Sequence, residues 1–223
     1  MIEQTFSRRL AAEFIGTAIL LAVIVGSGIM AERLAGGNMA IALLGNTIAI
    51  GFALVALILI FASVSGAHFN PIVSIAAAIS RDMTWADAGV FSAVQIVGAL
   101  FGVAVANLMF ELPMFFASER VRTGPAQWLG EFVAAFGLIG VIITVSRRHK
   151  TFVVALAVAA YITAAIWFTS STSFANPAVT IARSLSNTFT GIRPIDAPHF
   201  IVAQLLGGVA ATLVFNWLIP RKS

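Results

Sequence analysis

Cysteine is absent from this sequence, and charged side chains are scarce. With no cysteine among 223 residues, disulfides, thiolate chemistry and cysteine metal sites are excluded. Only 10% of the residues are charged, whereas a soluble domain usually carries about a quarter. The formal net charge of +4 is a small excess without a basic stripe, so a nucleic-acid partner is not expected. We also expect no metal site and no cofactor.

Apolar residues, in contrast, are abundant and occur in long runs. They make up 60% of the chain, and the mean hydropathy is +1.00. So little polar surface cannot cover a protein in water, which predicts lipid as the solvent. Runs of roughly 17 to 25 residues can span a bilayer. Six such runs are present, at 10–30, 41–63, 86–110, 128–146, 151–169 and 198–219.

The first run follows Arg8 and Arg9, as in a signal peptide. It is longer than a signal-peptide core and has no obvious small-residue cleavage site, so we interpret it as a retained first transmembrane helix.

Six spans place both termini on one side. Lys and Arg in the short loops then predict the orientation. Eight lie on the side of the termini: Arg8, Arg9, Arg81, Arg147, Arg148, Lys150, Arg221 and Lys222. The other side has Arg33, Arg120, Arg122 and Arg193, plus Arg183 if it is exposed there. The chain is therefore expected to be a multi-pass protein of the cell (inner) membrane, with both termini in the cytoplasm.

The two halves of the chain, about 10–110 and about 128–219, resemble each other. AAEFIGTAILL in the first half matches LGEFVAAFGLI in the second, and this alignment pairs Glu13 with Glu131. AVQIVGALFG matches VAQLLGGVAA in the same order. Each half holds three spans, an odd number, so the second half enters the membrane from the opposite side. This arrangement is an inverted repeat.

Each half also contains a short apolar segment that begins with Asn-Pro. SGAHFNPIVSIAAAIS contains Asn70 and Pro71, and TSFANPAVTIARSLS contains Asn176 and Pro177. A helix of ten residues is about 15 Å long, half of a hydrocarbon core of about 30 Å. Proline suits the first helical position, and asparagine is a favoured N-cap. We therefore predict two half-helices that enter from opposite faces and begin near the bilayer midplane.

Two helix N-termini that face each other at mid-membrane have a direct electrostatic effect. Each carries roughly half a positive charge, which opposes cations. The loops that lead into them are tolerated at that depth only against protein or a water-filled cavity. The amides of Asn70 and Asn176 can donate hydrogen bonds into such a cavity. The sequence therefore predicts a pore for uncharged solutes that excludes ions and protons.

SGAHFNPIV and SFANPAV resemble the paired Asn-Pro-Ala loops of the aquaporin, or major intrinsic protein, family. The Glu-Phe pairs of the first and fourth spans fit as well, and the resemblance covers essentially the whole chain. It implies an all-α membrane protein with six transmembrane helices plus two re-entrant half-helices, in one channel domain spanning 1–223. It also implies one pore per subunit, a homotetramer and no enzymatic activity. Ile72 departs from the pattern, since alanine is usual there, whereas Ala178 keeps it.

The resemblance further implies a four-residue filter on the extracellular side of the asparagines. Carried over by spacing, its positions are Ile50, Ala164, Ser173 and Val179. Water-selective members have aromatic, histidine and arginine residues there, and glycerol-type members keep the arginine and a following aspartate, where this chain has Thr180. An aliphatic ring without arginine predicts a wide, weakly selective filter. We therefore expect water, glycerol, urea and undissociated metalloid acids such as arsenous acid to pass. The resemblance supports the last of these, because some bacterial members that lack this arginine are associated with arsenite movement.

Several residues allow two interpretations. Arg183 either points into the outer vestibule or is a surface arginine. Glu13 and Glu131 lie inside apolar spans, where a charge is costly; they either relay protons or accept hydrogen bonds from the loop backbones. His68 either gates by protonation or braces its loop. Ser74 and His68 show no third partner for a hydrolase.

Two other functions compete with a passive channel. A secondary transporter can share the inverted repeat and broken helices. It should carry unpaired ionisable groups near the midplane, for which only the two glutamates qualify. A structural membrane protein with an occluded pore is the other alternative.

Overall fold

The computed structural model describes residues 4–220, and over that range it consists of eight α-helices without strands. Six are long: α1 (Phe6–Leu34), α2 (Met39–Phe61), α4 (Trp85–Met109), α5 (Pro125–Ser146), α6 (Thr151–Phe168) and α8 (Ala197–Leu218). Each is long and apolar enough to cross a membrane. The other two, α3 (Pro71–Ile79) and α7 (Pro177–Arg183), are short. The predicted all-α membrane fold with six spans and two half-helices is confirmed.

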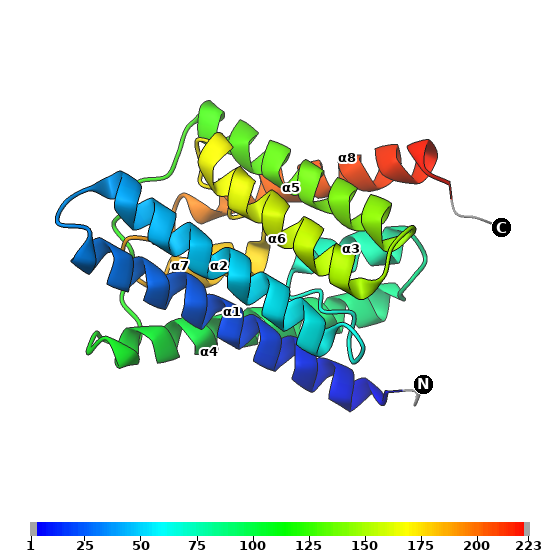
Figure 1. Ribbon diagram of the computed structural model, residues 1–223, viewed down its shortest axis with the longest axis horizontal. Helices are drawn as coiled ribbons and strands as arrows, with labels where there is room; N and C mark the ends of the chain where they lie inside the picture. The colour runs from blue at the N-terminus through cyan, green and yellow to red at the C-terminus, as the bar shows by residue number, and fades with distance from the viewer. Residues whose placement is uncertain (1–3, 221–223) are drawn as a thin grey trace.

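The long helices run side by side in one bundle (Figure 1). The helix α1 begins and α8 ends at the same end, which we call the termini side; the opposite end is the distal side. The half-helix α3 lies toward the termini side and α7 toward the distal side (Figure 1). The loops that join α3 to α4 and α5 to α6, with their predicted cationic residues, lie on the termini side. Arg221 and Lys222 fall outside the described residues.

The packing of the helices follows the predicted repeat. In the first half α1 packs against α4 and α2, and in the second half α5 packs in the same way against α8 and α6. The half-helices cross over, because α3 also contacts α8 and α7 also contacts α4. Each half therefore completes the core of the other, as an inverted repeat requires.

Glycines allow the paired helices to approach closely. A Cβ atom added at Gly98 of α4 would lie 2.6 Å from the backbone oxygen of Phe14 in α1, and one at Gly102 would overlap that of Ala18. Gly207 of α8 stands in the same relation to Phe132 of α5. Backbone contacts of this kind are typical of small-residue interfaces between membrane helices.

Gly102→Ala is expected to destabilise the protein, because the added methyl group meets the α1 backbone, which cannot move aside cheaply. Overpacking of this kind costs about 1–3 kcal/mol. Gly89, in the first turns of the same helix, has no neighbour within 4 Å of an added Cβ. Gly89→Ala should therefore be neutral or stabilising by up to about 1 kcal/mol. Thermal unfolding of both variants in detergent compares them, and equal shifts would contradict the packing interpretation.

The departure of the first motif at Ile72 has a packing explanation. Ile72 is buried among apolar residues that include Ile139 and Ala211. Its Cγ2 atom occupies the space that a Cβ at Gly208 would enter. The larger side chain in α3 is thus accommodated by glycine in α8, and the half-helix keeps its place.

Candidate pore and filter

The two half-helices begin as the Asn-Pro pairs predict. Asn70 is the N-cap of α3, and its Oδ1 atom accepts the Ile72 amide at 3.0 Å. Asn176 caps α7, and its Oδ1 atom accepts the amides of Ala178 and Val179 at 3.0 and 3.3 Å. In both helices proline occupies the first turn, where no amide hydrogen is needed. Local capping chemistry therefore sets where each half-helix starts.

The same asparagines join the two loops in the middle of the molecule. Asn70 Nδ2 donates to the Ala175 carbonyl at 2.8 Å, and Asn176 Nδ2 donates to the Phe69 carbonyl at 2.8 Å. An asparagine amide has two N–H donors. Within residues 4–220 the second donor of each has no protein partner, and both side chains line the central cavity. Two donors from opposite halves are thus available to a solute at one level.

The loops before the asparagines adopt a strained backbone at equivalent positions. Ala67 and Phe69 have φ of 53° and 49°, and Ser173 and Ala175 have φ of 48° and 47°. Residues other than glycine are uncommon in this left-handed region, and each such residue costs about 1–3 kcal/mol. Surrounding groups must therefore hold the loops in place.

Glu13 and Glu131 supply that support from α1 and α5. Glu13 accepts the backbone amides of His68 and Phe69 at 3.0 and 2.7 Å, and Glu131 accepts those of Phe174 and Ala175 at 2.9 and 2.8 Å. A glutamine of the same half also donates to each carboxylate: Gln95 at 2.8 Å and Gln204 at 2.6 Å. Both carboxylates are fully buried, and neither lines the cavity. The geometry favours loop support over proton relay.

Glu131→Ala is expected to lower the free energy of unfolding by about 2–6 kcal/mol, because it leaves two buried amides unpaired at about 1–3 kcal/mol each. Glu119→Ala is the matched control, since that side chain is exposed. Thermal unfolding in detergent measures both changes. A loss for Glu131→Ala no larger than that of the control would contradict the supporting role.

His68 belongs to the same hydrogen-bond network. Its Nδ1 atom lies 3.0 Å from the Ser74 hydroxyl, which also accepts Gln95 Nε2 at 3.1 Å. The imidazole packs edge-on against Phe91, with ring centroids 5.7 Å apart. Ser74 is completely buried, so its hydroxyl is not accessible to a substrate. These contacts favour bracing of the loop by His68. His68 also lines the cavity.

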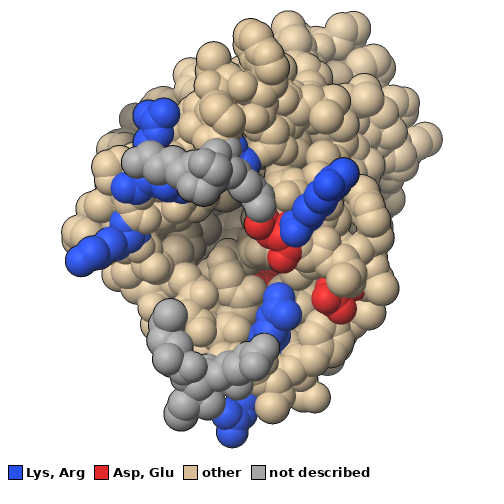
Figure 2. Space-filling view, turned by 90° about the vertical axis from the view of Figure 1, so that its right-hand side faces the viewer, with Lys and Arg blue, Asp and Glu red and all other residues tan. Residues whose placement is uncertain are grey.

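One cavity of about 730 Å³ passes between the two halves. Its lining includes Ser80 and Arg147 on the termini side, Asn70 and Asn176 in the middle, and Arg183 on the distal side. Figure 2 shows the termini side, where the surface is hollowed and Lys, Arg, Asp and Glu side chains lie around the opening. The cavity therefore extends along the bundle from one end toward the other.

Three of the four expected filter residues line this cavity, namely Ile50, Ser173 and Val179. The fourth expectation, Ala164, is wrong: Ala164 is exposed on the outside of α6 and is not part of the lining. Ile162 and Ile166 of the same helix line the cavity instead. With 3.6 residues per turn, positions two residues away from 164 lie on nearly the opposite face. Counting back from Asn176 crosses the irregular segment after α6, so the spacing alone does not determine which face of that helix is reached.

Of the two interpretations of Arg183, the structure supports the one in which its side chain points into the outer vestibule, on the distal side. Its side chain is buried and lines the cavity. The guanidinium Nε donates to the Thr190 carbonyl, and its central carbon lies 3.3 Å from the centroid of the Phe174 ring. The charge that is missing at position 179 is thus present one helical turn further out.

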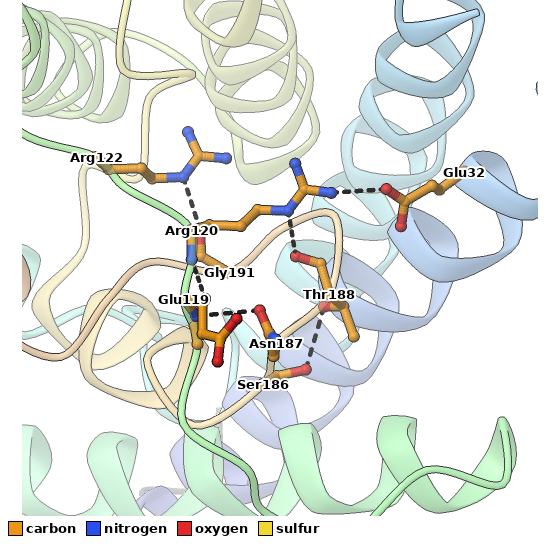
Figure 3. A network of polar contacts seen from close by, with 9 residues as sticks. Glu32, Glu119, Arg120, Arg122, Ser186, Asn187, Thr188 and Gly191 are labelled. Atoms are coloured by element: carbon orange, nitrogen blue, oxygen red, sulfur yellow. Dashed lines mark hydrogen bonds and ion pairs between the residues drawn. The ribbon is translucent and has the colours of Figure 1, made fainter. Parts of the chain in front are cut away.

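The structure also brings a second arginine, Arg122, to the vestibule. The sequence pattern identifies it only as a cationic residue of a loop. Its Nε donates to the Gly191 carbonyl at 2.7 Å, and its Nη1 to the Ser171 carbonyl at 3.2 Å. Figure 3 shows Arg122 beside Arg120, which binds the Thr188 carbonyl and Glu32. Both arginines fasten the loop between α4 and α5 across the loop that follows α7. No motif marks such contacts, because they join residues about 70 positions apart.

Comparison with known proteins agrees with this geometry. The sequence profile of the major intrinsic protein family matches residues 1–153 and 118–223. The aquaglyceroporin AqpS of Rhizobium meliloti (strain 1021) is 52% identical over 219 residues, which cover 98% of this chain and 93% of that protein. Aquaporin NIP3-1 of Oryza sativa subsp. japonica is 27% identical, over 95% of this chain and 68% of the relative.

A solved structure has the same fold. The X-ray structure of the aquaglyceroporin from Plasmodium falciparum superposes with a TM-score of 0.72 at 20% identity, covering 97% of this chain and 98% of that one. The two stretches matched by the family profile together include every residue of the sequence. With the paired Asn-Pro half-helices and the cavity between them, these matches show that the chain belongs to the major intrinsic protein family.

Proposed function

We propose that the protein is a passive channel through which water, glycerol and other small uncharged solutes cross the cell membrane. The observation that carries this proposal is the cavity between the two halves, with the amides of Asn70 and Asn176 at its middle, each with a second donor that has no protein partner within residues 4–220. The relative from Rhizobium meliloti, named an aquaglyceroporin, supports the inclusion of glycerol. A hydroxylated solute can replace its water hydrogen bonds with these amides as it passes.

The composition of the distal lining supports a wide solute range. Ile50, Val179 and Ile166 are aliphatic, and Ser173 contributes one hydroxyl. Without an arginine at position 179 the passage lacks the bulky stem and fixed donors that such a side chain adds. We include urea and undissociated metalloid acids such as arsenous acid among the solutes for this reason.

Exclusion of ions follows from the same elements. The N-termini of α3 and α7 meet at the asparagines, and each contributes a partial positive charge. An ion would also lose its hydration shell in a largely aliphatic passage, at a high cost. The proposal includes cytoplasmic termini in a multi-pass cell-membrane protein, in accord with the cationic loops of the termini side, and assembly as a homotetramer with one pore in each subunit.

Stopped-flow light scattering on proteoliposomes tests the channel. Shrinkage in an impermeant osmolyte measures water flux, and the recovery phase in glycerol or urea measures solute flux. Rates above those of empty vesicles, linear in solute concentration, are expected. No glycerol or urea flux above that of empty vesicles would refute the wide filter.

Coupled transport is distinguished by its dependence on gradients. Flux that saturates, or that responds to an imposed proton or sodium gradient, would favour a secondary transporter. Glu13 and Glu131 are the acidic residues of the transmembrane helices near the half-helix ends, and both are fully engaged with loop amides. Neither offers the unpaired carboxylate that coupling to an ion needs.

A further inference from the structure

The distal vestibule holds two guanidinium groups against one aromatic ring. The central carbon of Arg183 lies 3.3 Å from the Phe174 ring centroid, and that of Arg122 lies 5.1 Å from the same point. The guanidinium carbons of Arg122 and Arg183 are therefore separated by no more than the sum of the 5.1 Å and 3.3 Å distances. Both side chains line the cavity. Two like charges this close together repel each other and favour a shared counter-ion.

Neither guanidinium has a carboxylate partner among residues 4–220. The ion pairs in that range are Arg120 with Glu32 and Arg193 with Asp196. Asp196 does accept from Arg122, but from its backbone amide, at 3.0 Å. Glu131 attracts both guanidinium groups electrostatically, but it makes no ion pair with either and is engaged with the loop amides.

Several hydrogen-bond donors of this group are also unused. A guanidinium has five N–H donors, and within residues 4–220 Arg183 uses only its Nε toward protein. Arg122 uses Nε and Nη1, which leaves Nη2 without a partner in the same range. Polar groups that line a buried site normally find partners, so these unused guanidinium N–H groups point to a ligand that accepts hydrogen bonds.

Arg122 remains charged at neutral pH. Burial and the neighbouring Arg120 lower the pKa of Arg122 to about 10, which still leaves its guanidinium protonated in a neutral medium. An acceptor in the vestibule therefore faces positive charge as well as free donors.

We propose that Arg122 and Arg183, which both pack against Phe174, form a binding site for a small oxyanion at the distal mouth of the pore. Guanidinium groups match the paired oxygens of sulfate, phosphate and carboxylate groups. We call Arg122, Arg183 and Phe174 the vestibule anion site.

An anion bound there is expected to stay in the vestibule. The passage below it is lined by Ile50 and Val179, where an ion finds little to replace its hydration. A bound oxyanion would therefore obstruct the distal mouth and slow the entry of uncharged solutes from that side. This second consequence rests on the proposed channel function, whereas the binding itself does not.

Sulfate is a suitable probe because it stays fully ionised at neutral pH. Isothermal titration calorimetry of the purified protein in detergent, at an ionic strength held constant with sodium chloride, measures binding. Arg183→Gln and Arg122→Gln should each weaken sulfate binding by at least about tenfold, as expected for the loss of a charge-assisted hydrogen bond. Arg183→Lys keeps the charge without the fork and should retain part of the affinity.

Arg33→Gln is the matched control, because it removes one exposed charge from the same end of the molecule. Size-exclusion profiles establish that each variant is folded. The proposal is overturned if the wild type does not bind sulfate, if both vestibule variants bind it as the wild type does, or if Arg33→Gln weakens binding equally.

Glycerol flux into proteoliposomes, with and without external sulfate, tests the obstruction. Flux that falls with sulfate in the wild type, and falls less in Arg183→Gln, is expected. Glycerol flux absent without sulfate, together with intact sulfate binding, would reject the channel and leave the vestibule anion site standing. Normal glycerol flux without sulfate binding would reject the vestibule anion site and leave the channel standing.

Discussion

Val179→Arg is expected to reduce glycerol permeability by at least about tenfold, which corresponds to about 1.4 kcal/mol in the barrier, while water permeability stays measurable. Val179 is buried in the first turn of α7 and lines the cavity. An arginine at this position adds a long stem and a fixed fork of donors to an aliphatic passage. It also places a second arginine on α7, one turn from Arg183 on the same face of the helix. Because glycerol is larger than water, a narrower passage lowers its permeability more than that of water.

Two further variants separate the size of the side chain from its charge. Val179→Leu enlarges the residue without a charge and should reduce glycerol flux only slightly. Val179→Lys adds a charge without the planar fork and should fall between the two. Stopped-flow traces for glycerol and water, normalised to protein content, provide the comparison. Unchanged glycerol uptake by Val179→Arg would show that position 179 does not limit the passage.

The parts of the pore that depend on short-range rules could be predicted from the sequence. Asn70 and Asn176 cap the helices that follow them directly, so the start of each half-helix is a matter of local chemistry. Span length and hydropathy define the six long helices in the same way. The pairing of Glu13 with Glu131 came from internal similarity, and it identified the two acceptors that hold the loops.

The vestibule could not be predicted, because its contacts join distant segments. Arg122 reaches the loop after α7 across 69 residues, to the carbonyl of Gly191, and backbone carbonyls carry no sequence signal. Arg183 could be placed one turn beyond Val179 but not oriented, since a side chain at a helix end can turn either to the pore or to the surface. The path of the two loops decides the matter.

The filter position on α6 failed for a related reason. Counting back from Asn176 crosses the irregular segment between Phe168 and Asn176, which contains Thr172 and Ser173 with positive φ. A difference of two residues in such a segment turns the preceding helix by about 200°. The count thus selected Ala164 on the outer face, whereas Ile166 faces the pore.

Ile166→Trp is therefore expected to lower glycerol flux strongly, by about tenfold or more, equivalent to at least about 1.4 kcal/mol in the barrier. Ile166 is 5% exposed and lines the cavity together with Ile50 of the neighbouring helix α2. An indole placed there projects into a passage that the aliphatic side chains leave open. Water, which needs a narrower path, should be affected less.

Ala164→Trp is the decisive comparison because it adds more volume than Ile166→Trp, on the same helix and only two residues away. Ala164 is exposed on the outside of α6, so an indole there contacts lipid or a neighbouring molecule and leaves the bore unchanged. Glycerol flux near that of the wild type is expected. If Ala164→Trp blocks glycerol and Ile166→Trp does not, α6 is rotated from the orientation described, and the aliphatic filter built on Ile166 is wrong.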